Sequence, residues 1–164
     1  KNSLFKDQSG AKQDTIKDFC KKIELIKKTR NSKDFLIGAR IESFILGKGL
    51  QDGLRRAKAY SEAGADLILI HSKEKNPKEI FSFSKIFRTK KYYKPLVSVP
   101  STYSKTTEST LEKNGFKIVI YANHMLRAAY PAMQNVAKTI LKNQRSFELE
   151  GKISSVKEVI NLIK

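Results

Sequence analysis

Four short apolar segments of the chain end in polar side chains that could bind a substrate. These side chains are Arg40 and Glu42, His71 and Ser72, Ser101, and Asn123 and His124. Arg40 and His71 end segments that we expect to be buried, where a cation costs free energy unless it meets an anion. A guanidinium beside an imidazole suits a small substrate that carries carboxylate or phosphoryl oxygens. We therefore predict substrate contacts for Arg40 and His71, and local hydrogen bonds in loops for Ser101 and Asn123.

The segments that position these side chains alternate between predicted strands and predicted helices. Uninterrupted apolar runs predict strands at 35–40, 66–71, 95–100 and 117–122. Capping signals predict helices that begin after Asp14, at Gln51 (ending at Gly64), at Asn76-Pro77, after Thr106 or Thr107, near Met125, and after a capping box at Ser155. Strands of this kind, each followed by a helix, predict a parallel sheet that is covered on both faces. The order fits either a small doubly wound sheet or half of an eight-stranded barrel.

The chain is strongly basic, with 33 Lys and Arg against 16 Asp and Glu among 164 residues and a formal net charge of +17. Only seven of the basic residues are arginine, the usual side chain for bidentate recognition of phosphates and bases. Since the lysines are also spread along the chain, we expect a solvated basic surface or an anionic substrate rather than a nucleic-acid partner. A single cysteine, Cys20, fits a reducing compartment, so we expect a cytoplasmic protein. No apolar run approaches the ~20 residues of a membrane helix.

Several catalytic motifs are absent from the sequence. It contains no GxxxxGK[ST], no GxGxxG and no GxSxG motif. One cysteine and two histidines cannot form a zinc cluster. Glu42 is the only clear magnesium ligand among the predicted strand ends, so we expect most ligands of any metal to lie outside this chain.

Six motifs of the sequence are similar to those of one enzyme family. They are GARIESF at 38–44, AKAYSEAGAD at 57–66, IHSK at 70–73, VPSTY at 99–103, YANHMLRA at 121–128 and ISSVKE at 153–158. Together, and in this order, they resemble the phosphoenolpyruvate mutase branch of the isocitrate lyase superfamily over essentially the whole chain. The opening Lys1-Asn2-Ser3-Leu4 resembles the end of that family's mobile lid loop.

The resemblance implies a fold and a domain organisation. Residues 1–164 would form the C-terminal half, strands five to eight, of a (β/α)8 TIM-type barrel. Residues 1–14 would be the end of the lid loop. Residues 125–164 would contain a long helix that is exchanged between neighbouring subunits, followed by a tail helix. A homo-oligomer, either a dimer or a tetramer, is then expected.

The resemblance also implies a reaction and a set of site residues. Enzymes of the family convert phosphoenolpyruvate to phosphonopyruvate with magnesium, which is the entry to phosphonate biosynthesis. By position, Asn2 of the lid would contact the transferring phosphoryl group, Arg40 would bind substrate oxygens and His71 would steady the substrate. The family's nucleophilic aspartate, acidic magnesium ligands and serine-led phosphate loop have no counterpart here. We therefore expect this chain alone to be inactive.

Three other interpretations stay open. Phosphonopyruvate hydrolase shares the barrel, the arginine and the histidine, but tends to carry threonine where this chain has Asn2, which favours the mutase. Methylisocitrate and isocitrate lyases match the local motifs less well. A non-catalytic, anion-binding half-barrel is compatible with the lysine excess and with the missing catalytic aspartates.

Overall fold

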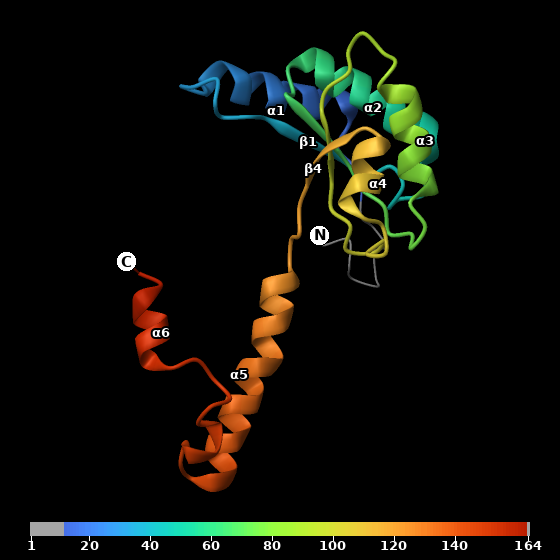
Figure 1. The fold of residues 1–164 in the computed structure, drawn as a ribbon. Coiled ribbons are helices and arrows are strands. Elements are labelled where there is room, and N and C mark those ends of the chain that lie inside the picture. The colour runs from blue at the N-terminus through green and yellow to red at the C-terminus, as the bar shows by residue number, and fades with distance from the viewer. Residues whose placement is uncertain (1–11, 164) are drawn as a thin grey trace. The chain divides into compact units, whose positions relative to one another are not determined.

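The computed structural model describes residues 12–163 and divides the chain into two compact units. The first unit ends at Ala122 and the second begins at Asn123. Figure 1 shows that strands and helices alternate along the first unit, whereas the second unit is helical. This order of elements confirms the alternation predicted from the sequence.

A four-stranded parallel sheet forms the centre of the first unit. Its strands are β1 (Gly38–Ile41), β2 (Leu67–Ile70), β3 (Leu96–Ser98) and β4 (Phe116–Val119). They lie side by side in chain order. Right-handed crossovers that always step in the same direction place their helices on one face of a sheet, whereas a doubly wound sheet reverses direction at a switch point. The strand order therefore favours half of a barrel over a doubly wound sheet.

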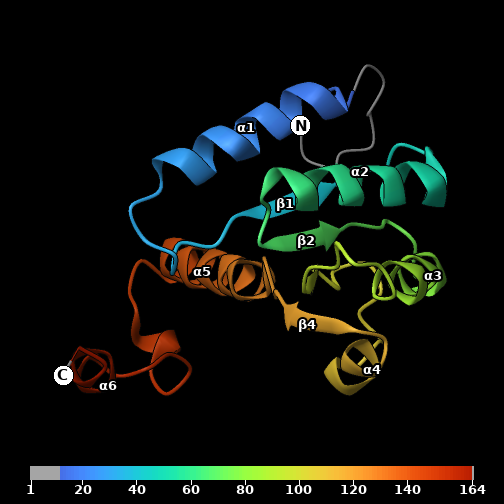
Figure 2. The same ribbon diagram turned by 90° about the horizontal axis from the view of Figure 1, so that it is seen from above.

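The helices of the first unit lie along one side of this sheet (Figure 2). They are α1 (Ile16–Thr29), α2 (Gly49–Ala63), α3 (Lys78–Phe87) and α4 (Glu108–Lys113). The side chains of β1 and β2 on the helical side are at most 1% exposed; they are Ala39, Ile41, Ile68 and Ile70. On the opposite face Arg40 is exposed and Leu69 is only half-buried. Within the described residues the helices therefore cover one face of the sheet, because consecutive crossovers keep them on one side.

Aromatic side chains of α3 fill the space between the helices and the sheet. Phe83 and Phe87 are both fully buried, and their ring centroids are 5.3 Å apart in a stacked arrangement. Burying an aromatic side chain of this size contributes roughly 1.5–3 kcal/mol. At Gly53 of α2 the backbone lies close to α3, since a Cβ there would be in ordinary van der Waals contact with the Phe83 ring at 3.6 Å. The core therefore fixes α2 and α3 against β2.

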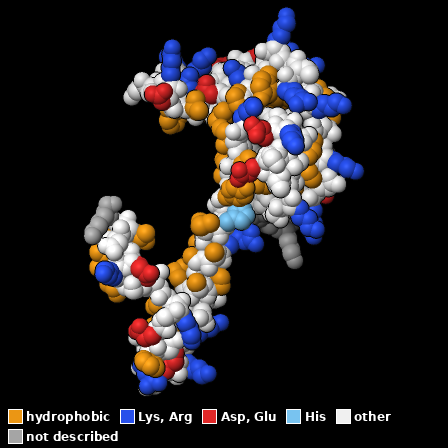
Figure 3. Space-filling view, in the orientation of Figure 1, with side chains coloured by type: hydrophobic (Ala, Val, Ile, Leu, Met, Phe, Trp, Pro, Cys, Tyr) orange, Lys and Arg blue, Asp and Glu red, His pale blue; other side chains and the backbone are white. Residues whose placement is uncertain are grey.

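Lysine and arginine side chains are scattered over the face of the molecule seen in Figure 3 and do not gather into a single patch on it. A dispersed charge of this kind is typical of a solvated basic surface.

The second unit consists of α5 (His124–Asn143), a short 3-10 helix (Phe147–Leu149) and α6 (Val156–Asn161). None of the side chains of α5 is buried, and Pro131 lies inside the helix. The capping box predicted at Ser155 is confirmed, because its Oγ accepts the N–H of Glu158 at 3.2 Å. Across residues 12–163, the structure contains no helix that is both long and apolar enough to cross a membrane.

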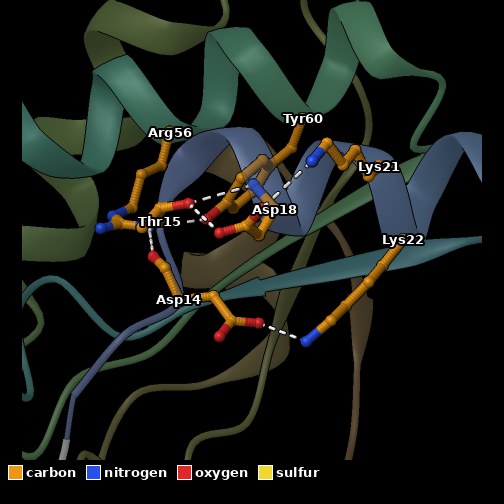
Figure 4. Close-up of polar contacts among 7 residues, drawn as sticks. All are labelled: Asp14, Thr15, Asp18, Lys21, Lys22, Arg56 and Tyr60. Carbon is orange, nitrogen blue, oxygen red and sulfur yellow. Dashed lines mark hydrogen bonds and ion pairs between the residues drawn. The ribbon is translucent and has the colours of Figure 1, made fainter.

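The start of the first helix differs from the prediction by one residue. Asp14 is the predicted cap, but Thr15 occupies the N-cap position, and its Oγ1 accepts the N–H of Asp18 at 3.1 Å (Figure 4). Asp14 instead forms an ion pair with Lys22. The helix begins at Ile16 because the extended backbone of Thr15 places its hydroxyl at the first unpaired N–H groups.

The first strand also begins later than predicted, at Gly38 rather than at residue 35. The carbonyl oxygen of Phe35 accepts a hydrogen bond from Nη1 of Arg30 at 3.0 Å, so it is bonded to the end of α1 and not to β2. Pairing between β1 and β2 then starts at Gly38 and Leu67. The predicted end of α2 is confirmed, since Gly64 has φ of 113° and terminates the helix in the left-handed conformation.

Candidate active site

Arg40, Glu42 and His71 come together at the carboxyl ends of β1 and β2. Arg40 lies opposite Leu69 in the parallel register of these strands. The N–H of His71 donates to the carbonyl oxygen of Ile41 at 3.2 Å, which extends the register and places His71 beside Glu42. Because side chains alternate along a strand, Arg40, Glu42 and His71 share the face opposite the helices.

The charge of Arg40 is balanced by Glu42. Nε of Arg40 donates to Oε1 of Glu42, and the two side chains are 48% and 27% exposed. The anion that a cation requires at this position is therefore supplied in part by the chain itself. The pair holds the guanidinium at the edge of the sheet, where its partial exposure makes it accessible to an anionic ligand.

His71 is much more buried than Arg40, with 6% of the residue exposed. Burial is the main reason why the pKa of His71 lies below its ordinary value; the positive charge of Arg40 lowers it further, and Glu42 opposes both effects. A neutral imidazole has one N–H donor and one acceptor nitrogen. The site therefore combines a permanent cation with a neutral hydrogen-bonding group, which suits phosphoryl or carboxylate oxygens.

The serines predicted at the strand ends hold loops together. Ser72 is fully buried, and its Oγ donates to Oε1 of Glu79 in α3. The carbonyl oxygen of Ser72 accepts a hydrogen bond from Oγ1 of Thr102 at 3.1 Å, which ties the loop after β2 to the loop after β3. The N–H of Ser101 donates to the carbonyl oxygen of Val99 at 2.8 Å in a turn. These contacts agree with the local role predicted for Ser101.

The remaining predicted residues lie outside the described part of the first unit. Asn123 and His124 belong to the second unit, where the carbonyl oxygen of Asn123 accepts the N–H of Arg127 at 3.0 Å in the first turn of α5. Asn2, the predicted lid residue, lies outside the described residues. Of the three predicted catalytic residues, the structure brings Arg40 and His71 together.

The described part of the chain does not offer a complete metal site. Within residues 12–163, no group of three or more His, Cys, Asp or Glu side chains is placed to hold a metal ion. Glu42, the magnesium ligand suggested by the sequence, forms an ion pair with Arg40. Magnesium binds oxygen ligands in nearly octahedral geometry, so these residues alone do not fit the ion.

A buried polar network next to the loop after β1 is the feature that the motifs do not reveal. Oγ of Ser43 donates to Oδ2 of Asp52 at 2.7 Å, and Nε of Arg56 donates to the same oxygen at 3.0 Å. Nη1 of Arg56 also donates to the hydroxyl of Tyr60 at 2.8 Å and to the carbonyl oxygen of Asp14 at 2.9 Å (Figure 4). The network joins α2 to the loop after β1 and to the segment before α1.

The network also changes the acidity of its carboxyl group. Burial alone would raise the pKa of Asp52, but hydrogen bonds from Ser43 and Arg56 outweigh it and hold the pKa below the ordinary value. The i, i+4 spacing of Asp52 and Arg56 on a predicted helix is the one sequence signal for this ion pair. The contact of Asp52 with Ser43 has no such signal, because it depends on how α2 packs beside β1.

A parallel sheet whose strands run in chain order, with a cation and a buried imidazole at its carboxyl edge, defines the class: half of an enzyme-type (β/α) barrel. Residues 3–141 match the family model described as phosphoenolpyruvate phosphomutase. The chain belongs to this family.

Two curated relatives carry different activities in their names. A phosphoenolpyruvate phosphomutase of Tetrahymena pyriformis is 40% identical over 162 residues, covering 99% of this chain and 53% of the relative. A phosphonopyruvate hydrolase of Variovorax sp. is 43% identical over 150 residues, covering 90% of this chain and 50% of the relative. The chain thus spans about half the length of the relatives it matches.

Solved structures of a phosphomutase and of a hydrolase both superimpose on this chain. A phosphoenolpyruvate phosphomutase from Streptomyces platensis subsp. rosaceus superimposes with a TM-score of 0.88 at 36% identity, over 98% of this chain and 54% of the other. A phosphonopyruvate hydrolase in complex with oxalate and magnesium superimposes with a TM-score of 0.84 at 39% identity, over 97% and 55%. These matches agree with a half-barrel.

Proposed function

We propose that the complete protein interconverts phosphoenolpyruvate and phosphonopyruvate, and that this chain is the C-terminal half of its catalytic barrel. The observation that carries the proposal is the cationic Arg40 beside the buried His71, in a chain of the phosphoenolpyruvate phosphomutase family. Substrates of (β/α)8 barrels bind at the carboxyl edge of the strands, where both residues lie.

The reaction moves a phosphoryl group within one molecule, so no atom is gained or lost. The bond between phosphorus and the enol oxygen breaks, and a bond between phosphorus and C3 forms. In a loose transition state the phosphoryl oxygens carry the negative charge. Arg40 would bind substrate oxygens, His71 would hold the substrate by a hydrogen bond without adding a second charge, and Asn2 would contact the transferring group. Such positioned charges and donors supply much of the acceleration in phosphoryl transfer.

The proposed reaction uses magnesium, which we expect the other half of the barrel to bind. We expect its acidic ligands and the nucleophilic aspartate on an N-terminal half, because residues 12–163 do not fit the ion. When bound there, magnesium would neutralise charge on substrate oxygens. The phosphonopyruvate hydrolase structure that contains magnesium and oxalate supports a role for the metal.

Hydrolysis of phosphonopyruvate to pyruvate and phosphate is the second candidate function. Identity of 43% with a phosphonopyruvate hydrolase favours it. The two reactions differ in the fate of the phosphoryl group, which returns to the same molecule in the mutase and passes to water in the hydrolase. Asn2, where the hydrolase branch tends to carry threonine, favours the mutase.

We also infer that α5 packs against a neighbouring subunit in a homo-oligomer. Leu126, Tyr130 and Met133 are 68%, 58% and 57% exposed, and their spacing places them on one face of the helix. An exposed apolar stripe of this kind is typical of a protein interface.

Phosphorus NMR of the complete protein with magnesium and phosphonopyruvate tests the proposed reaction. A phosphoenolpyruvate signal would support the mutase, and free phosphate with pyruvate would establish the hydrolase instead. We expect the 164-residue chain alone to give neither product. A folded complete protein that leaves phosphonopyruvate unchanged would favour the non-catalytic, anion-binding half-barrel.

A further inference from the structure

A cavity lies on the helical side of the first unit, whereas Arg40 and His71 are on the other face of the sheet. Its volume is about 330 Å³. It lies between α3 and the end of α4 and is lined by Lys78, Phe81, Ser82, Lys85, Arg88 and Asn114. The volume is at the lower end of the range of small-molecule sites.

The charge of this cavity has one sign. Three of its six lining side chains are cations, and none is an acid. Among the described residues, no carboxylate oxygen lies within 4.0 Å of the charged nitrogens of Lys78, Lys85 or Arg88. Glu79, the acid on α3, accepts the hydroxyl of Ser72. The cavity therefore favours an anion with more than one negative charge.

The cavity also has an aromatic wall. Phe81 is half-buried, and the centroid of its ring is 6.4 Å from that of Phe116 in β4, so one side of the ring is held by the core. Because Phe81 also lines the cavity, it is an aromatic partner for a planar group bound there, and stacking on aromatic side chains is tolerant of the base involved. The hydroxyl of Ser82 adds a polar group to the same wall.

The end of α4 that closes the cavity is fixed in place. Oγ of Ser84, which is fully buried, donates to the carbonyl oxygen of Asn114. Gly115 follows with φ of 89°, and a Cβ there would stand 2.8 Å from Oγ of Ser84 and 3.5 Å from Cδ of Arg88. Glycine thus lets the backbone approach both side chains. The wall is consequently formed by packed backbone and not by a free loop.

We propose that this cavity binds a nucleoside phosphate, with the base against Phe81 and the phosphate groups among Lys78, Lys85 and Arg88. The inference is independent of the proposed function, because no residue of the cavity belongs to the carboxyl edge of the sheet. A bound nucleotide would join α3 to α4 on the side of the sheet that the reaction does not use.

Calorimetric titration of the complete protein with ADP tests this proposal, with adenosine and inorganic phosphate as partial ligands. We expect saturable binding of ADP that is at least roughly tenfold tighter than that of either part, since base and phosphate have separate contacts. The double variant Lys85→Gln, Arg88→Gln should weaken ADP binding by at least roughly tenfold, because it removes charge-assisted hydrogen bonds. Lys90→Gln with Lys91→Gln is the matched control, since both lysines are exposed and neither lines the cavity.

Two further variants test whether the nucleotide binds in this cavity and not in the active site. Phe81→Leu should weaken ADP binding several-fold and leave the affinity for inorganic phosphate unchanged, and circular dichroism would check its fold. Arg40→Ala should leave ADP binding intact. The proposal would be overturned by a folded protein that does not bind ADP, by phosphate binding as tight as that of ADP, or by affinity that survives the loss of Lys85 and Arg88. Loss of ADP binding in Arg40→Ala would place the nucleotide in the active site and would equally overturn it.

Discussion

At the residue scale, the proposed chemistry depends on the difference between an exposed Arg40 and a buried His71. Arg40 supplies a guanidinium cation. His71 is held toward its neutral form by burial first and by the charge of Arg40 second. The guanidinium therefore supplies one positive charge, and the imidazole supplies a neutral hydrogen-bond donor. Together they suit a phosphoryl or carboxylate group without adding a second positive charge.

The titration of His71 should respond in opposite directions to its two charged neighbours. We expect its NMR titration midpoint to lie below 6.5. Arg40→Gln should raise the midpoint because it removes a positive charge, and Glu42→Gln should lower it because it removes a negative charge. A wild-type midpoint at or above 6.5, or shifts of the same sign in both variants, would refute this description of the site.

The same shift makes folding stability depend on pH. Because the pKa of His71 is lowered in the folded state, the unfolded chain binds more protons below about pH 6.5, and stability is lost as the pH falls from there. Urea unfolding of the complete protein between about pH 5 and 7.5 should show this slope, and His71→Gln should flatten it.

At the element scale, the network of Ser43, Asp52 and Arg56 fixes the loop that carries Glu42. The side chains of Asp52 and Arg56 are 9% and 7% exposed, so loss of Asp52 would leave the buried guanidinium of Arg56 without its carboxylate partner. We expect Asp52→Ala to lower the free energy of unfolding by roughly 3 kcal/mol in a urea titration. Asp18→Ala, which affects the exposed pair with Lys21, is the control and should have little effect. Equal effects of the two changes would contradict the role of the network.

A second prediction at this scale concerns α5. Met133→Asp should shift the complete protein toward a smaller assembly in light scattering, because it places a charge in the proposed interface. Asn135→Asp introduces the same charge on the opposite side of the helix and should leave the mass unchanged. An unaltered mass in Met133→Asp would contradict the proposed packing of α5 against a second subunit.

The elements show what a single sequence can and cannot reveal. Apolar runs and caps such as Gly64 and Ser155 predict the alternation of strands and helices, because these signals are local. The side of the sheet that the helices cover could not be predicted, since it depends on the order of the strands. The ion pair between Arg40 and Glu42 depends on the direction of the side chains along one strand. The contact between Ser72 and Glu79 depends on how α3 packs against the sheet.

At the scale of the whole molecule, the first unit has the form of half a barrel. Its strands run in chain order, its helices lie on one side, and the chain spans about half the length of its relatives. The open face of the sheet presents Arg40 at one edge, and Ile118 and Ile120, 37% and 41% exposed, further along. We expect the other half of the barrel to cover this face and to bring the catalytic acids opposite Arg40 and His71.

The most direct test of the account is the turnover of phosphonopyruvate by the complete protein carrying Arg40→Ala, with Ser101→Ala as the control. Removing a charge that stabilises the transferring group should reduce kcat by at least about a hundredfold. Ser101→Ala should stay close to the unaltered enzyme, because among residues 12–163 the N–H of Ser101 has a partner in the turn and its side chain has none. A near-normal rate for a folded Arg40→Ala protein would show that the carboxyl edge of β1 and β2 is not the substrate site.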